Sequence, residues 1–317
     1  MNPATRGGKP PPRRTLLMAH EALGGTRHGG YLVSAMRPIW ESWGCRILDV
    51  DSPHHWPGAD AVFVHVDLTF VPSGYAKEAT RYATTLNARA DSIAKRTCTS
   101  GVIRSGDGYE GPVMVKTNLN HAGIPEVRQW NRQHPPARWP RLTNRWPFRK
   151  NAADPPPPSL SKESYTVFAS PRLVPPGIYD NPEWVVQRFC TERYGDEFVL
   201  REYYFLGEAE CLRTEIGREP IFTSGRLIHH AAGPIHGELR SLRQKLGLDY
   251  GKIDYVMEDG KPFIFDVNKT IGADTPPTKA SKELASLLAW GLFPKWEMFR
   301  HGGAPSANAR SQESFEE

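Results

Sequence analysis

The sequence predicts a mixed α/β fold, with an open and mainly parallel N-terminal sheet followed by a domain of antiparallel hairpins. Near the N-terminus, apolar runs alternate with helical segments through short connections, which is typical of an open α/β sheet. In the second half, two pairs of runs rich in β-branched and aromatic residues are joined by short turns containing glycine, near 206–207 and at 258–260. A chain of 317 residues is long enough for two or three such compact units.

The N-terminal domain is expected at residues 14–94, after a basic and proline-rich stretch at 1–13 that we expect to be disordered. Strands are predicted at 15–19, 45–50 and 61–66, and helices at 31–43 and 74–93. Two Gly-Gly pairs, at 24–25 and 29–30, follow the first strand, where open α/β sheets bind ligands. Their spacing matches neither the dinucleotide nor the phosphate-loop motif, so a binding loop and a flexible turn both remain open.

Composition narrows the class of protein. Lys and Arg number 40 against 35 Asp and Glu, and this formal charge of +5 suits an anionic substrate without requiring nucleic acid. The cysteines are scattered without C-x-x-C spacing, at Cys45, Cys98, Cys190 and Cys211. No apolar stretch approaches the roughly 20 residues that span a bilayer. We therefore expect a protein of the reducing cytoplasm, with no membrane partner.

Residues 248–272 are the most informative stretch of the chain. Two strand-like runs flank a turn, and apolar residues occupy their odd positions, at Ile253, Tyr255, Met257, Phe263, Phe265 and Val267. If both apolar sets face one core, the turn contains the three residues Glu258 to Gly260, and Asp254 lies opposite Ile264. Asp266 then becomes a diagonal neighbour of Asp254, and Asn268 lies two residues further along the same face.

Three oxygen-bearing side chains on one face of a hairpin indicate a cation site. Neighbouring carboxylates raise each other's pKa unless a cation neutralises them. Mg²⁺ takes oxygen ligands of this kind, usually together with phosphate groups. A magnesium–nucleotide site is therefore our interpretation, and a solvated strand face with ordinary surface acids is the alternative.

The run I-D-Y-V, a hairpin and then F-D-V-N-K-T with a following glycine resemble the metal-binding end of the ATP-grasp fold. The resemblance covers about 95–272 and implies that Asp254, Asp266 and Asn268 hold Mg²⁺ or Mn²⁺ against the phosphates of ATP. The family more often has glutamate at the second acid, and Asp266 is one methylene shorter, so bidentate coordination there is less secure. The fold implied is a pre-ATP-grasp α/β domain followed by a two-lobed ATP-grasp domain at 95–301, with a disordered tail at 302–317.

The same resemblance implies contacts to ATP. One lysine precedes the first strand of the family's grasp domain and another lies on a strand before a flexible loop, which correspond to Lys95 and Lys116 as cations for the phosphates. The family's hinge segment V-Q-x-F meets the adenine, which corresponds to Gln187 and Phe189. Glu197 is a weaker candidate for the ribose hydroxyls. A buried strand without a ligand is the alternative for the hinge segment.

Two arginines are embedded in the hairpin formed by 198–205 and 208–216. A cation among apolar residues needs a partner, which a triphosphate or an acyl phosphate would provide. Arg213 best matches the arginine that the ATP-grasp family places near the transferred phosphate, and Arg201 is the second candidate. An internal ion pair is the competing account of Arg201.

In ATP-grasp enzymes the small α/β domain often contributes to the acceptor pocket. This implies substrate contacts from the glycine-rich segment after the first strand, where Glu21, Arg27 and His28 are the candidates. A structural role is the alternative for each of them.

Residues 128–164 differ from the rest of the chain, because basic residues alternate with Trp130, Trp139 and Trp146 before a polyproline run at 155–158. Such a segment could grip single-stranded nucleic acid or an acidic glycan. We favour an insertion whose tryptophans pack onto the grasp domain, since no known nucleic-acid module accompanies it. Nucleic acid is therefore not expected as a partner.

The resemblance implies an ATP-dependent ligase that activates a carboxylate as an acyl phosphate and joins it to an amine or similar nucleophile. The expected partners are a small-molecule or peptide carboxylate and an amine acceptor. Two alternatives remain, a kinase of a small molecule or glycan and a non-catalytic protein that binds glycan or nucleic acid. The sequence leaves the oligomeric state open, a homodimer included.

Overall fold

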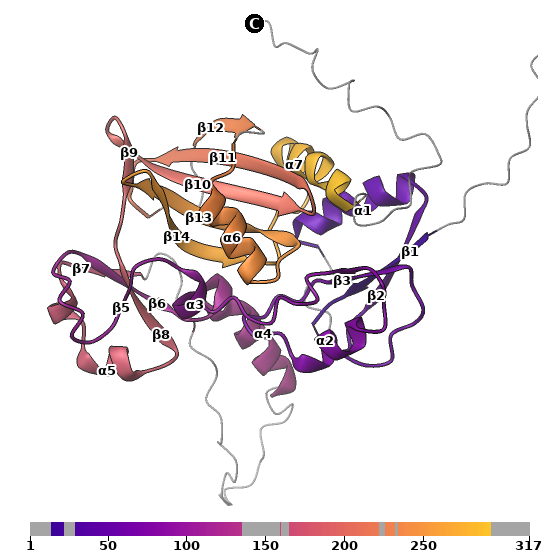
Figure 1. Ribbon diagram of the computed structural model, residues 1–317, viewed down its shortest axis with the longest axis horizontal. Helices are drawn as coiled ribbons and strands as arrows, with labels where there is room; N and C mark the ends of the chain where they lie inside the picture. Colours follow the sequence, from indigo (N-terminus) through magenta and orange to yellow (C-terminus); the bar gives the residue numbers. More distant parts are fainter. Residues whose placement is uncertain are drawn as a thin grey trace, which may run out of the picture.

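The computed structural model describes residues 14–21, 29–134, 159, 165–221, 226–231 and 234–292, which form three sheets (Figure 1). The predicted parallel N-terminal sheet is confirmed, with strand order β2-β1-β3-β4. Its strands are β1 (Arg14–Ala19), β2 (Cys45–Val50), β3 (Ala61–Val64) and β4 (Thr85–Leu86), and its helices are α1 (Leu32–Ser42) and α2 (Ser73–Ala79). A helix over 74–93 is wrong: α2 ends at Ala79, because the β-branched Thr85 and the buried Leu86 join the sheet instead.

The second sheet is antiparallel and six-stranded, in the order β12-β11-β10-β13-β14, with β9 paired to β10. Its strands are β9 (Glu192–Tyr194), β10 (Glu197–Leu206), β11 (Ala209–Gly217), β12 (Arg226–Ala231), β13 (Tyr250–Glu258) and β14 (Lys261–Asn268). Helices α6 (Gly237–Lys245) and α7 (Lys279–Ala289) pack on opposite faces of this sheet, and both are visible in Figure 1. The two predicted hairpins are therefore neighbours in one sheet.

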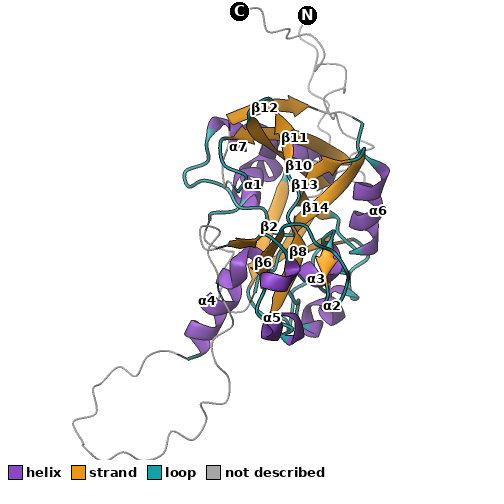
Figure 2. Cartoon of the chain, turned by 90° about the vertical axis from the view of Figure 1, so that its left-hand side faces the viewer, coloured by secondary structure: helices purple, strands orange, loops and turns teal. Residues whose placement is uncertain are grey.

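The third sheet is also antiparallel, in the order β5-β8-β6-β7, and lies at the lower left of Figure 1. Its strands are β5 (Val102–Ile103), β6 (Val113–Thr117), β7 (Thr166–Phe168) and β8 (Trp184–Arg188), and α5 (Pro176–Asp180) packs beside β8. In Figure 1, α3 (Lys95–Cys98) and α4 (Ile124–Gln133) lie between the parallel sheet and this one, and the 3₁₀ turn η1 (Asn120–Gly123) directly precedes α4. Figure 2 shows α4 extending away from the three sheets.

One hydrophobic core joins the N-terminal sheet to the six-stranded sheet. Met36 and Trp40 of α1 and Phe63 of β3 are buried in the same cluster as Tyr204 of β10 and Leu288 of α7. The opposite face of the parallel sheet has a separate cluster, made by residues from 17 to 79. The boundary expected between residues 94 and 95 stays a prediction, and the core is continuous across it.

The hairpin of β13 and β14 differs from its predicted register. Glu258 pairs with Lys261, so the turn has two residues, Asp259 and Gly260, with φ values of 50° and 78°. Positive φ at both positions is typical of the Asp-Gly turns whose twist matches that of the flanking strands. A β-bulge at Phe265 then shifts the pairing, so that Asp254 lies opposite Asp266 instead of Ile264.

The bulge also changes which side chains face the core. Ile264 is buried beside Tyr255 and Val267 in the cluster under α6. Phe265 instead lines a cleft on the other face, so the prediction that every odd position faces one core is wrong for Phe265. One extra residue in β14 therefore brings both carboxylates into a single cross-strand pair.

Candidate active site

A cleft of about 750 Å³, including the part open to solvent, lies between the six-stranded sheet and the sheet of β5 to β8. Five of the residues predicted from the sequence line it, namely Lys95, Lys116, Phe189, Asp254 and Asp266. Much of the remaining lining is apolar, with Met114 from β6, the side chains of 198–200 from β10, and Ile221. The lining of the cleft thus combines charged and apolar side chains, as a nucleotide would require.

Charged side chains form one row across the six-stranded sheet. Arg213 lies opposite Glu202, Glu202 opposite Asp254, and Asp254 opposite Asp266. Residues directly opposite each other in a sheet project from the same face. Arg213, which was predicted from the sequence, therefore projects from the same face of the sheet as Asp254 and Asp266. Glu202 is also on this face, and the sequence analysis did not identify it.

Lys252 forms ion pairs with two carboxylates of this row. Its Nζ lies 2.7 Å from Glu202 Oε1 and 3.0 Å from Asp254 Oδ1. The hydroxyl of Tyr204 donates to the other Glu202 oxygen at 2.8 Å. Burial raises the pKa of Asp254 to about 6; the Lys252 ammonium opposes this shift, and the negative charges of Glu202 and Asp266 add to it. The sequence signal that could have identified Lys252 is its position two residues before Asp254, on the same pleat face.

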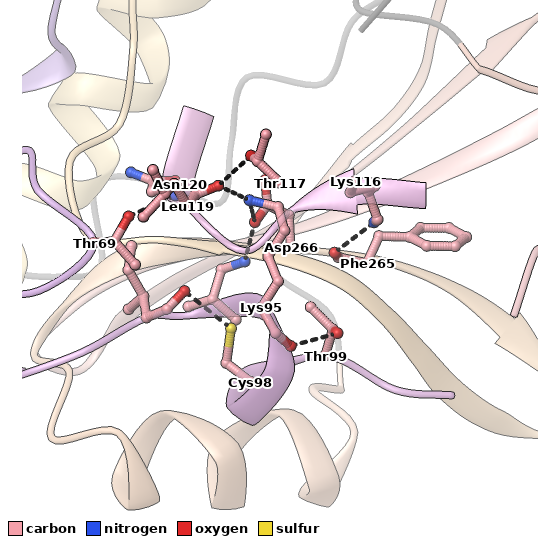
Figure 3. Close-up of polar contacts among 12 residues, drawn as sticks. Thr69, Lys95, Cys98, Thr99, Lys116, Thr117, Leu119, Asn120, Phe265 and Asp266 are labelled. Atoms are coloured by element: carbon pink, nitrogen blue, oxygen red, sulfur yellow. Dashed lines mark hydrogen bonds and ion pairs between the residues drawn. The ribbon is translucent and has the colours of Figure 1, made fainter. Parts of the chain in front are cut away.

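Lys95 and Lys116 line the same cleft and contact β14 at Asp266 and Phe265, respectively (Figure 3). Lys95 is 1% exposed, and its Nζ lies 3.1 Å from Asp266 Oδ1 and donates to Leu119 O at 2.7 Å. The Nζ of Lys116 donates to Phe265 O at 3.1 Å. Burial lowers the pKa of Lys116 to about 8, and the nearby carboxylate of Asp266 opposes the shift. The two lysines predicted from distant parts of the sequence therefore converge on one strand, β14.

Asn268 lies on the same face of β14, two residues beyond Asp266 and opposite Lys252. Two carboxylates in facing positions and a nearby amide match the oxygen ligands of Mg²⁺, which usually takes its remaining ligands from water and phosphates. No group of three or more His, Cys, Asp or Glu side chains suited to a metal occurs among the described residues. The side chains of Asp254 and Asp266 occupy facing positions on one face of the sheet, so their oxygens, with that of Asn268, form a donor set that fits a divalent cation.

Arg201 projects from the opposite face of the sheet, where Tyr255 is its cross-strand neighbour. Its Nε lies 3.0 and 2.9 Å from the two carboxylate oxygens of Glu192, which also accepts a hydrogen bond from the backbone N–H of Met257 at 2.7 Å. This geometry is the internal ion pair that the sequence left open for Arg201. Of the two arginines, Arg213 alone shares a face with the carboxylates.

Gln187 and Glu197 are not among the described residues that line the cleft. The Nε2 of Gln187 donates to Ser100 O at 2.7 Å and to Ile264 O at 2.9 Å, which joins the two antiparallel sheets. Glu197 begins β10 and accepts from Arg226 Nη2 at 3.2 Å. Phe189 is the residue of the predicted hinge segment that reaches the cleft.

In the N-terminal domain, Glu21 lies two residues after the end of β1 and is buried, and it accepts a hydrogen bond from the backbone N–H of Asp67 at 3.2 Å. Asp67 in turn accepts from the hydroxyls of Tyr31 at 2.7 Å and Thr270 at 2.5 Å, and from Asn120 Nδ2 at 3.3 Å. Asp67 and Thr270 were not identified from the sequence, because the contact between them depends on tertiary structure.

Several predictions fall on residues that the structure does not describe. Arg27 and His28 lie outside the described residues, as do most of the basic insertion and both expected disordered ends. Within the described ranges, none of the helices combines the length and the apolar character needed to cross a membrane.

Neither a protein-family model nor a curated protein matches this chain. Among solved structures, D-alanine–D-alanine ligase from Bacillus anthracis is similar at 9% identity and a TM-score of 0.43, over 90% of this chain and 96% of that one. A RimK domain ATP-grasp protein from Sphaerobacter thermophilus gives 13% identity and a TM-score of 0.43, over 87% and 97% of the two chains. The macrocyclase MdnC from Microcystis aeruginosa, bound with precursor peptide MdnA, gives 13% identity and a TM-score of 0.39, over 86% and 99%.

Proposed function

We propose that this protein is an ATP-grasp ligase, which uses ATP to activate a carboxylate as an acyl phosphate and joins it to an amine or similar nucleophile. The observation that supports this most is the meeting of Lys95 and Lys116 with Asp254 and Asp266 in one cleft. Two cations and two carboxylates in facing positions suit a magnesium–triphosphate group, which carries both negative oxygens and a metal.

In this proposal Asp254, Asp266 and Asn268 hold Mg²⁺ or Mn²⁺, and the metal offsets charge on the phosphates of ATP. Lys95 and Lys116 bind phosphate oxygens from the other wall of the cleft. Because both lysines are buried, their charges act with little screening by solvent. The apolar side chains that line the cleft, Phe189 among them, accept the adenine ring.

Transfer of the phosphoryl group needs positive charge aimed at the oxygens that become more negative. Arg213 and Lys252 supply it from the face that carries the carboxylates. Neither the activation nor the attack by the amine requires a nucleophilic side chain, so the protein contributes positioning and electrostatic stabilisation. Arg201, on the other face, is assigned a structural role.

The acceptor carboxylate and amine are proposed to bind at the carboxyl ends of β1 and β3, near Glu21 and Asp67. Open α/β sheets bind ligands at this edge. Thr270 reaches the same point from the loop after β14, so the proposed acceptor region adjoins the proposed metal site. A small-molecule or peptide carboxylate is the substrate class, and the acceptor residues beyond Glu21 include Arg27 and His28.

A cytoplasmic location is part of the proposal. All four cysteines are unpaired, and Cys45, Cys98 and Cys211 are buried. Burial raises the pKa of each of these three thiols, to about 11, about 12 and about 11, respectively. Free cysteines without disulfides are typical of a reducing compartment.

The test is calorimetric titration of the protein with the non-hydrolysable analogue β,γ-imido-ATP, with and without Mg²⁺. We expect binding that depends on Mg²⁺ and that Asp266→Asn removes, whereas the exposed acid variant Glu208→Gln binds as the wild type does. A folded wild-type protein that does not bind imido-ATP would contradict the proposal.

ADP release is then measured with pairs of carboxylates and amines. A ligase releases ADP with both acceptors and forms an amide. A stable phosphorylated product from a single acceptor, with no use of the amine, would identify a kinase instead.

A further inference from the structure

Lys269 directly follows the proposed metal ligand Asn268 and is buried, with 1% of its surface exposed. Its Nζ donates to Val66 O at 2.9 Å and to Leu68 O. Both carbonyls lie just after β3, in the N-terminal domain. A buried ammonium group needs partners, and here backbone carbonyls of another part of the chain supply them.

The next residue makes a second anchor to the same place. Thr270 Oγ1 donates to Asp67 Oδ1 at 2.5 Å, and Asp67 lies between the two residues whose carbonyls accept from Lys269. Tyr31 OH also donates to Asp67, at 2.7 Å. Two consecutive side chains after Asn268 are therefore fixed to one short segment at the carboxyl end of β3.

Asp67 extends this connection to the phosphate side of the cleft. Asn120 Nδ2 donates to Asp67 Oδ1 at 3.3 Å, and the carbonyl of the preceding residue, Leu119, accepts from Lys95 Nζ at 2.7 Å. Lys95 also pairs with Asp266, as Figure 3 shows. These contacts form a continuous chain. Asp266 pairs with Lys95, and Lys95 bonds to the 119–120 segment. That segment bonds to Asp67, and Asp67 bonds to Thr270 in the loop after Asn268.

We propose that Lys269, together with Thr270, is a positioning residue that fixes Asn268 relative to Asp254 and Asp266 and thereby sets the affinity of the site for Mg²⁺. This inference rests on the proposed magnesium–nucleotide site. Groups that orient metal ligands typically change metal affinity about 10- to 100-fold when they are removed. Lys269 does not touch the nucleotide or the metal in this proposal, and it acts through the position of Asn268.

The competing account is that Lys269 only fastens the N-terminal domain to the rest of the chain. A matched control exists, because Trp40 Nε1 donates to Ala289 O at 3.1 Å and also joins these two parts through a buried hydrogen bond. Trp40→Phe removes that bond and keeps an aromatic ring. General loosening would follow from Trp40→Phe as well, whereas a shift of Asn268 follows from the variants of Lys269 and Thr270 alone.

The experiment titrates Mg²⁺ into full-length protein with imido-ATP and records binding by calorimetry, for wild type, Lys269→Met, Thr270→Val and Trp40→Phe. We expect the Mg²⁺ concentration at half-maximal binding to rise about tenfold or more in Lys269→Met. Thr270→Val should shift it in the same direction, and Trp40→Phe should leave it unchanged. Binding of imido-ATP without metal should be equal in all four proteins.

An unchanged Mg²⁺ requirement in Thr270→Val and Lys269→Met would overturn the inference, as would an equal shift in Trp40→Phe. If Lys269→Met does not fold, Thr270→Val decides the question, because it removes one hydroxyl and conserves volume. Wild-type protein without Mg²⁺-dependent binding would overturn the proposed function and this inference together. Normal wild-type binding with unshifted variants would overturn the inference alone.

Discussion

Asp254 and Asp266 lie directly opposite each other across β13 and β14, and each is ion-paired with its own lysine. Lys252 Nζ is 3.0 Å from Asp254, and Lys95 Nζ is 3.1 Å from Asp266. A metal ion at these carboxylates therefore competes with two ammonium groups. In the proposed complex, the phosphates of ATP would give Lys95 and Lys252 new partners in place of the carboxylates that Mg²⁺ would occupy.

Asp266→Ala should lose Mg²⁺-dependent binding of imido-ATP and should also be destabilised. From the hairpin alone one expects the fold to stay intact, because Asp266 faces away from the apolar layer. Lys95 changes this expectation, since removing one partner of a buried ion pair leaves an uncompensated charge and costs about 3–5 kcal/mol. Because Asp266 is partly exposed, we expect the lower end of that range, measured by urea unfolding.

Asp266→Asn is the matched variant, since it keeps the size of the side chain and an oxygen near Lys95. It should unfold at a urea concentration closer to that of the wild type, while still losing Mg²⁺-dependent binding. Equal stability of Asp266→Ala and the wild type would show that the pair with Lys95 contributes nothing to the fold.

Lys252→Met should destabilise the protein by about 3–5 kcal/mol, because it leaves the buried carboxylates of Glu202 and Asp254 facing each other without the ammonium group that contacts both. The double variant Lys252→Met, Glu202→Gln should recover part of this loss, since it removes one of the two charges. Thermal unfolding of the two single variants and the double variant gives the coupling between Lys252 and Glu202. Additive effects would contradict a direct pair.

Arg213 and Arg201 should behave oppositely when each is replaced by methionine. Arg213→Met should lower the rate of ADP release per folded molecule by about 10²–10³-fold, because it removes a charge from the face of the carboxylates. Arg201→Met should lower stability and leave the rate per folded molecule unchanged, because its partner Glu192 is on the other face. An activity loss in Arg201→Met at unchanged stability would reverse the two assignments.

The affinity for imido-ATP without metal should fall as the pH rises from 7 to 9. The pKa of Lys116 is about 8 because of burial, so Lys116 loses its positive charge across this range. Lys116→Arg stays charged, so the ratio of the two affinities corrects for titration of the ligand. A ratio that does not change with pH would exclude Lys116 from phosphate binding.

The lowered pKa of Lys116 should also make the protein more stable as the pH rises above about 8. Between about 8 and the ordinary value of 10.5, the unfolded chain binds the Lys116 proton while the native protein has released it. Stability rises with pH wherever the unfolded state binds more protons, so Lys116 contributes a gain in this window. In Lys116→Met that gain is absent, which unfolding measured at pH 7.5 and pH 10 would detect.

Gln187→Leu should cost about 1–3 kcal/mol, because it removes the side-chain donor from the carbonyl of Ser100 and one of the two donors from the carbonyl of Ile264, which also accepts from the Ser100 N–H. Imido-ATP should bind to the folded fraction of this variant with nearly normal affinity. A large loss of affinity with unchanged stability would instead support the adenine contact that the ATP-grasp resemblance implies for Gln187.

The face of the hairpin that carries the proposed metal ligands could be predicted from the sequence, because side chains alternate strictly along a strand. The register could not, since it depends on the twist of the Asp259-Gly260 turn and on where a bulge absorbs the mismatch. Phe265 was predicted to face the core because it occupies an odd position of the strand. The bulge at this residue turns its side chain toward the cleft instead. One local irregularity therefore changes a diagonal pair of carboxylates into a direct one.

Contacts between distant segments could not be predicted from the sequence for a different reason. The pair of Arg201 with Glu192 and the anchor of Lys269 at Val66 depend on which strands become neighbours, and periodicity within a segment carries no such information. Lysines 95 and 116 were identified because a family resemblance supplied their roles. Lys252 and Glu202, whose side chains lie in the same charged network, had no such support and were missed.

The shared core determines when the N-terminal sheet can complete its folding. One face of that sheet is closed by side chains from β10, β13 and α7, which ends at Ala289. During synthesis the ribosome delivers residues 14–94 long before it delivers α7, so the apolar surface formed by Met36, Trp40 and Phe63 stays uncovered in the nascent chain. We therefore expect a fragment ending at residue 94 to aggregate, and the full-length chain to fold slowly because its stabilising contacts join its two ends.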